Sequence, residues 1–135
     1  MKSPKEIVGQ MMENDLFSKW LGISILDIGL GYCTLQNTVS KDMLNGFSIA
    51  HGGISYSLAD SALAFASNSH GVKCVSIETS ISHIRPVFEN DTLTASAKEL
   101  HRGRTIAIYE VIISNQDKKT VALFKGTVNI SIENW

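Results

Sequence analysis

The chain has 135 residues, a formal net charge of −1 and a hydrophobic fraction of 44%. This length corresponds to one domain, and a high apolar content with a low net charge excludes a disordered chain. No apolar run approaches the roughly 20 residues of a membrane-spanning helix, and the first residues lack the apolar stretch of a secretory signal. Without a basic excess, general nucleic-acid binding is not indicated. We expect one cytoplasmic domain, residues 1–135, with no membrane or nucleic-acid partner.

The N-terminal half predicts two helices separated by a hairpin. Ser3 and Glu6 fit a capping box that starts a helix, whose helical character is expected to fade between Asn14 and Gly22. Residues 23–30 and 32–39 are typical of two strands joined at a glycine-rich turn. After an irregular segment over 41–50, apolar residues at three- and four-residue spacing predict a long helix over 53–69. Its remaining positions are mostly small, which indicates close packing on several sides.

The C-terminal half predicts strands. Four strands are expected over 73–85, 92–101, 105–114 and 120–132, joined by short polar turns. Such a series describes an antiparallel meander. The predicted fold class is therefore α+β, with about six strands and one long helix lying against the sheet.

The cysteines and histidines indicate neither a metal site nor a redox motif. Cys33 and Cys74 form no Cys-x-x-Cys pair and adjoin no histidine, and the four histidines are scattered. We expect two buried free thiols in a reducing compartment, no metal and no organic cofactor.

The start of the long helix is a candidate binding site. Two glycines, Gly52 and Gly53, follow His51 and open the helix, where backbone N–H groups have no partner within the helix. Such groups can hold an oxygen that becomes negative during a reaction. A tight turn into the helix explains the same residues without any ligand, and the spacing alone does not decide between the two interpretations.

Asp60 is a second unusual residue. It lies in the middle of a helix that is otherwise expected to be buried, and a buried carboxylate needs partners or a chemical role. A solvent-facing Asp, or one that bonds a neighbouring strand, is the structural alternative.

Together these motifs resemble hotdog-fold acyl-CoA thioesterases, most closely those of phenylacetate degradation. The resemblance rests on Asn45-Gly46, His51-Gly52-Gly53 and Leu58-Ala59-Asp60, and it extends to Glu13-Asn14-Asp15, Ile84-Arg85-Pro86 and residues 91–95 and 119–124. It implies an antiparallel sheet wrapped around one long central helix. It also implies hydrolysis of an acyl-CoA thioester, with phenylacetyl-CoA or its ring-hydroxylated relatives as substrate.

The resemblance assigns a role to each matching position. Asp60 would activate water or attack the thioester, and the backbone N–H of Gly52 would polarise its carbonyl. His51 and Asn45 would orient the reacting group, beside Gly53, and Ser76 would hold the attacking water. The CoA phosphates could meet Arg85, Arg102 and Arg104, since Arg suits phosphate recognition, although each also fits a solvated turn or strand end.

A shared site in a homo-oligomer is expected from helix geometry. Gly52 and Asp60 are eight residues apart, which is ~12 Å along a helix, whereas both must approach one thioester within ~3 Å. An antiparallel second copy of the helix would bring Asp60 of one chain near Gly52 of the other. The resemblance likewise implies a dimer, often paired again into a tetramer.

Three other functions remain open. A hotdog hydroxyacyl dehydratase or hydratase would use His51, but the context of Asp60 favours a thioesterase. A non-enzymatic acyl-CoA sensor would not need Asp60, and a purely structural domain would not need the set Asn45, His51 and Asp60.

Overall fold

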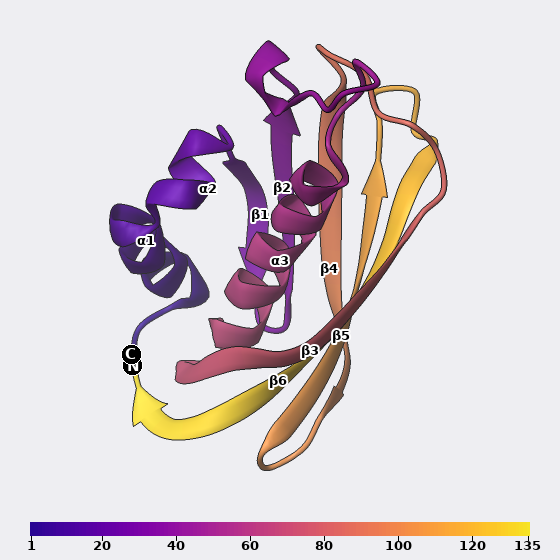
Figure 1. Cartoon of the computed structure of the whole chain (residues 1–135). Helices are drawn as coiled ribbons and strands as arrows, with labels where there is room; N and C mark the ends of the chain where they lie inside the picture. The colour runs from indigo at the N-terminus through magenta and orange to yellow at the C-terminus, as the bar shows by residue number, and fades with distance from the viewer.

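A single antiparallel sheet curls around one helix in the computed structural model, which describes all residues 1–135. The six strands have the order β1-β2-β4-β5-β6-β3, and the sheet wraps around α3 (Gly52–Asn68) in Figure 1. The strands are β1 (Ser24–Gly29), β2 (Tyr32–Thr38), β3 (Val72–His83), β4 (Thr92–Arg102), β5 (Ile106–Ser114) and β6 (Thr120–Asn134). The predicted α+β class and the hotdog arrangement are confirmed.

The core lies between α3 and the concave face of the sheet. Leu58, Ala62 and Phe65 are fully buried there, together with Leu35, Leu93, Tyr109, Val111 and Ile113 from the strands. Small residues allow the sheet to approach the helix closely, and a Cβ at Gly126 of β6 would collide with Leu63 of α3. The small-residue pattern of the sequence therefore does reflect tight packing.

Two helices, rather than one that fades, precede the sheet. Helix α1 (Pro4–Asn14) starts with the predicted capping box, in which the Ser3 side chain accepts from the N–H of Glu6. A second short helix, α2 (Leu16–Trp20), follows because the Asp15 carboxylate accepts the N–H of Ser18 at 2.9 Å and restarts the helix. The Ser18 hydroxyl also lies 2.8 Å from that of Ser61, which attaches α2 to α3.

The predicted four-strand meander is wrong at its first strand. Strands β4, β5 and β6 do form a meander, but β3 pairs with β6 at the sheet edge and β4 pairs with β2. The segment between β3 and β4 is therefore a crossover, although it resembles a turn in length. Long-range pairing decides which strands are neighbours, and local turn signals do not report it.

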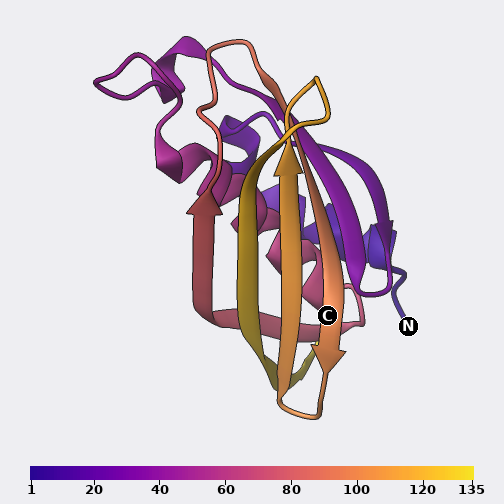
Figure 2. The ribbon, with the colours of Figure 1, turned by 90° about the vertical axis from the view of Figure 1, so that its right-hand side faces the viewer.

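Strand β3 is sharply bent at its exposed edge. Its register against β6 shifts between Val72 and Cys74 and again between Ser76 and Glu78, and Figure 2 shows the strand turning around the end of the sheet. Bulges of this kind bend a strand and redirect its side chains. Val75 and Ile77 are 68% and 58% exposed on this strand.

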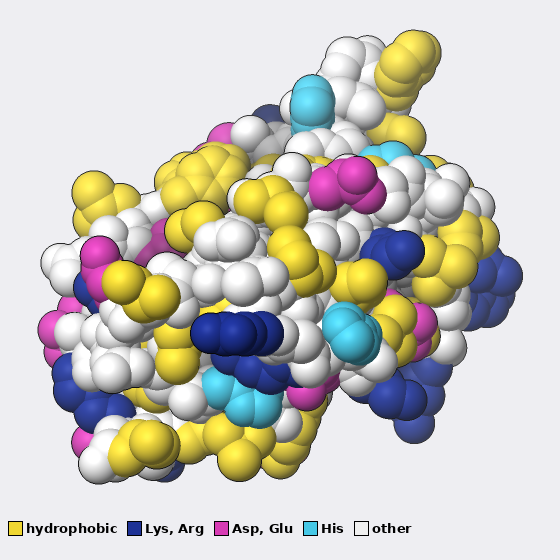
Figure 3. All heavy atoms as spheres, turned by 90° about the horizontal axis from the view of Figure 1, so that it is seen from below, with side chains coloured by type: hydrophobic (Ala, Val, Ile, Leu, Met, Phe, Trp, Pro, Cys, Tyr) yellow, Lys and Arg dark blue, Asp and Glu magenta, His cyan; other side chains and the backbone are white.

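The surface has a mixed character. Figure 3 shows basic and acidic side chains interspersed on one face, with hydrophobic side chains exposed among them. None of the helices combines the length and the apolar character needed to cross a bilayer. Cys33 and Cys74 are buried free thiols, as predicted, and burial raises the pKa of Cys33 to about 12.

Candidate active site

The loop that leads into α3 is organised by the Asn45 side chain. Its Oδ1 accepts the backbone N–H groups of Phe47 at 2.9 Å and Ile49 at 3.4 Å. These bonds support a turn in which Ser48 has a φ of +61°. Because the carbonyl of the Asn45 amide is used inside the loop, its Nδ2 donors are the groups left for a ligand.

His51 caps α3 and separates the two glycines by function. Its Nδ1 accepts the N–H of Gly53 at 2.9 Å, which requires an unprotonated Nδ1 and places the proton of the neutral ring on Nε2. No group of the chain accepts the N–H of Gly52. The helix therefore opens with one satisfied and one free backbone donor, and the free one belongs to Gly52.

A hollow of about 360 Å³ lies in front of the Gly52 N–H. Its walls come from the loop, from the first turn of α3 and from the end of β3 with the segment that follows. The lining residues are Asn45, Ile49, Ala50, His51, Gly52, Ser55, His83, Ile84, Arg85, Pro86 and Val87. Three predicted site residues, Asn45, His51 and Gly52, thus meet in one place, and Arg85 lies beside them.

His83 and Ser55 belong to this hollow but were not predicted from the sequence. His83 Nδ1 lies 3.3 Å from the Ser55 hydroxyl. A Cβ built on Gly52 would be 3.3 Å from His83 Nε2. No spacing in the sequence connects His83 with Gly52, because the end of β3 and the start of α3 meet only through the packing of the helix on the sheet.

Asp60 and Ser76 meet in a second hollow of about 230 Å³. Asp60 projects from the middle of α3, and Ser76 lies on β3 beside its bulge. Burial of the carboxyl, and secondarily the negative charge of Asp15, raise the pKa of Asp60 above its ordinary value of 3.8. Neither a cation nor a hydrogen bond offsets this burial. Asp60 is thus a half-buried carboxylate without a structural partner, which is an arrangement typical of functional sites.

The three predicted phosphate-binding arginines lie in different surroundings. Arg85 is exposed, and its Nη1 donates to the carbonyl of Thr120 at 2.6 Å. Arg104 is exposed in the turn between β4 and β5. Arg102 is turned inward at the far end of α3, where its Nη1 donates to the carbonyl of Ser67 and lies 3.8 Å from Glu99. These contacts give Arg102 a structural role that the sequence did not reveal.

The two hollows are separate within one chain. Gly52 begins α3 and Asp60 lies eight residues later on the same helix, so their backbones are ~12 Å apart along its axis. The two hollows share no lining residue. A single chain therefore presents a donor half and a carboxylate half of a site, in two places.

Comparison with known proteins identifies the family. Residues 47–122 match the family model of the thioesterase superfamily. The chain is 46% identical to the acyl-coenzyme A thioesterase PaaI of Escherichia coli K12 over 116 residues, which are 86% of this chain and 83% of that protein.

Solved structures agree with this assignment. The structure of the E. coli PaaI protein from the phenylacetic acid degradation operon superposes with a TM-score of 0.95 at 40% identity, covering 97% of this chain and 95% of that one. A hypothetical thioesterase of Streptococcus pneumoniae with coenzyme A superposes with a TM-score of 0.81 at 26% identity, covering 84% and 88%. The family indicated by the sequence motifs is thereby confirmed: the chain belongs to the thioesterase superfamily.

Proposed function

We propose that the protein hydrolyses an acyl-CoA thioester to a free acid and CoA. The observation that carries this proposal is the pairing, on one helix, of a free backbone donor at Gly52 with an unpartnered half-buried carboxylate at Asp60. Thioester hydrolysis needs both groups, because negative charge develops on the carbonyl oxygen while a base or nucleophile acts at the carbonyl carbon.

The donor half would stabilise the developing oxyanion. The Gly52 N–H points from the positive end of α3, and a preorganised N–H is worth ~3 kcal/mol at such an oxygen. Asn45 Nδ2 and His51 Nε2 supply further donors from the same hollow to orient the thioester group. Gly53 contributes through its missing side chain and the bond that aligns His51, since its own N–H is occupied.

The carboxylate half would supply the attacking group. Asp60 acts either as the base that activates water or as the nucleophile itself, and Ser76 is placed to hold that water by its hydroxyl. No metal and no organic cofactor takes part in this scheme, and CoA is part of the substrate.

A complete site would form between two copies of the chain. Strand β3 is an unpaired edge that carries two exposed apolar side chains, Val75 and Ile77, next to Ser76. Antiparallel pairing of this edge with its copy would continue the sheet and cover those side chains. The same two-fold arrangement would bring Asp60 of one chain toward Gly52 of the other.

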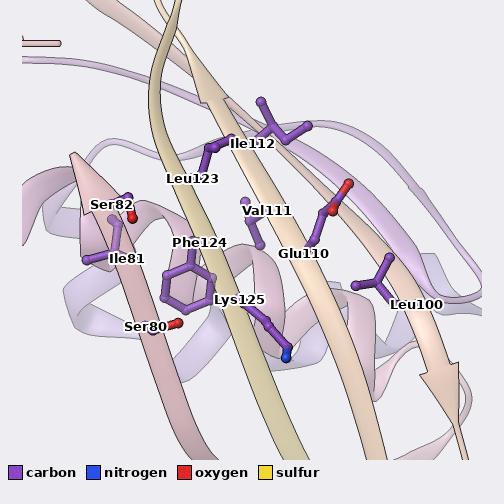
Figure 4. A pocket seen from close by; sticks show the side chains of 10 residues that line it. All are labelled: Ser80, Ile81, Ser82, Leu100, Glu110, Val111, Ile112, Leu123, Phe124 and Lys125. Atoms are coloured by element: carbon purple, nitrogen blue, oxygen red, sulfur yellow. The ribbon is translucent and has the colours of Figure 1, made fainter. Parts of the chain in front are cut away.

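The opposite face of the sheet offers a contact for pairing such dimers into a homotetramer. Figure 4 shows a hollow of about 290 Å³ on the strands β3, β6, β5 and β4. Leu100, Ile112 and Leu123 are 40–50% exposed at this hollow. Glu110 and Lys125, opposite each other on neighbouring strands, give it one charge of each sign.

The acyl group is proposed to be phenylacetyl or a ring-hydroxylated phenylacetyl. This proposal derives from the similarity to the E. coli protein of the phenylacetic acid degradation operon. Arg85, beside the Gly52 hollow, is the first of the three arginines to test for contact with the CoA phosphates, followed by Arg104 and Arg102. Such a reaction, together with two buried free thiols, fits a reducing cytoplasm.

The decisive experiment measures release of free CoA thiol over a panel of aryl- and alkyl-CoA esters. We expect hydrolysis of several esters, with the highest kcat/KM for phenylacetyl-CoA or a hydroxylated relative. The same preparation is assayed for hydration of an enoyl-CoA, which tests the dehydratase alternative. Binding of CoA esters without hydrolysis of any of them would support a sensor instead.

A further inference from the structure

His83 is a polar side chain at the site whose place the mechanism above does not use. It is exposed at the end of β3 and lines the hollow in front of Gly52. The other three histidines differ from it: His51 caps α3, His70 bonds Glu99, and His101 lies exposed near the β4–β5 turn. Only His51 and His83 therefore flank the free N–H of Gly52.

The position of the His83 ring relative to Gly52 suggests what it does. In the first turn of a helix, the Cα–Cβ direction of a residue and its free N–H both tilt toward the N-terminal end. A Cβ on Gly52 would lie 3.3 Å from His83 Nε2, so this nitrogen borders the space into which the Gly52 N–H points. An oxygen bound by that N–H would approach the edge of the His83 ring.

The second ring nitrogen of His83 has its own partner. Nδ1 lies 3.3 Å from the hydroxyl of Ser55, a buried residue in the first turn of α3. When this hydroxyl donates to Nδ1, the proton of the neutral ring is placed on Nε2, on the side of the hollow. The geometry resembles that of His51, whose Nδ1 is also occupied by α3 and whose Nε2 is free.

We propose that His83 is a second electrophilic donor of the oxyanion site, with Nε2–H hydrogen-bonded to the thioester oxygen that the Gly52 N–H also binds. This inference rests on the proposed thioesterase function and adds a residue to it. No proton is transferred: the bond shortens as charge develops on the oxygen and relaxes when the carbonyl re-forms. Ser55 acts as a positioning residue that holds the ring and its tautomer.

The kinetic test compares four variants with the wild-type protein. His83→Phe keeps a ring and removes the donor, and we expect kcat to fall about 10- to 100-fold with KM changed less than about threefold. His83→Gln restores an N–H donor and should recover part of the loss. Ser55→Ala should lower kcat by a smaller factor. His101→Phe, the matched exposed histidine outside the hollow, should behave as wild type.

A spectroscopic test separates an oxyanion donor from a merely structural residue. The probe is a CoA ketone in which a methylene replaces the thioester sulfur, carrying a ¹³C-labelled carbonyl that cannot be hydrolysed. We expect the infrared carbonyl band of the bound ketone to lie at higher frequency in His83→Phe than in the wild type, and to be unshifted in His101→Phe.

The outcomes distinguish this inference from the proposed function. A His83→Phe protein with wild-type kcat, or with an unshifted carbonyl band, would overturn the role of His83 while leaving the thioesterase intact. A wild-type protein that hydrolyses no ester of the panel would remove the proposed function itself. Melting curves of all variants accompany both tests, and His83 is exposed, so its replacement should leave the fold unchanged.

Discussion

The Nδ1 atom of His51 accepts the N–H of Gly53 at 2.9 Å. This one bond gives two adjacent glycines different roles, because it satisfies one backbone donor and leaves that of Gly52 open to the hollow. It also fixes which edge of the His51 ring faces outward. The N-cap of α3 thus prepares the donor half of the site as part of folding the helix.

Replacement of Gly52 by Ala is expected to lower kcat about 10- to 100-fold, with a smaller effect on the affinity for CoA esters. The N–H remains, but the new Cβ would lie 3.3 Å from His83 Nε2 and crowd the approach of the carbonyl. Steady-state kinetics measure this. Gly9→Ala is the control, since a Cβ there meets nothing within 4 Å. Wild-type kinetics in Gly52→Ala would reduce both glycines to turn residues.

Asp60→Asn is expected to lower kcat about 10²- to 10⁴-fold while binding of CoA esters is retained. In the wild type, activity should fall as the pH drops through the pKa of Asp60, and burial places this acidic limb above the ordinary value of 3.8. The pH dependence of kcat/KM measures the limb. Asp117→Asn, in an exposed turn, is the control. Retention of most activity in Asp60→Asn would show that another residue performs the chemistry.

The stability of the same variant should change in the opposite direction. The folded-state pKa of Asp60 is raised, so its unfavourable contribution is absent below the unfolded pKa and grows as the pH rises through the folded pKa. Asp60→Asn should therefore raise Tm by about 2–5 °C at neutral pH, and this gain should disappear below pH 3.8. Thermal unfolding at several pH values checks it. A neutral-pH Tm below that of the wild type would mean that the carboxylate stabilises the fold.

Local signals in the sequence were sufficient for most elements and for both halves of the site. The capping box at Ser3, the apolar spacing of α3 and the unusual Asp60 are each readable from a few neighbouring residues, and each is present in the structure. The restart of the helix at Asp15 was missed because a single cap created α2 where the pattern was weakening.

Features that depend on distant segments were not readable in this way. The edge position of β3 follows from its pairing with β6, about 45 residues further along the chain, and no turn signal encodes it. The same applies to His83, which reaches Gly52 only because β3 ends beside the start of α3. The inward orientation of Arg102 depends on Glu99, Tyr109 and the end of α3 together.

A charge on the exposed edge strand should separate the subunits and abolish activity together. Ile77→Lys places a cation on β3 where we propose two chains to pair, and we expect the mass in solution to fall to that of one chain with at least a tenfold loss of kcat/KM. Light scattering and kinetics on one sample measure both. Leu30→Lys, at the opposite end of the strand order, is the control. A fully active monomer would contradict the shared site.

The most direct test of a site shared between chains mixes two inactive proteins, Asp60→Asn and Gly52→Ala, under conditions in which subunits exchange. Half of the dimers in an equal mixture are hybrids, and each hybrid has one site with both an intact Gly52 and an intact Asp60. The account therefore predicts recovery of about one quarter of wild-type activity, following the time course of exchange measured with labelled subunits. Complete exchange without any recovery of activity would contradict it.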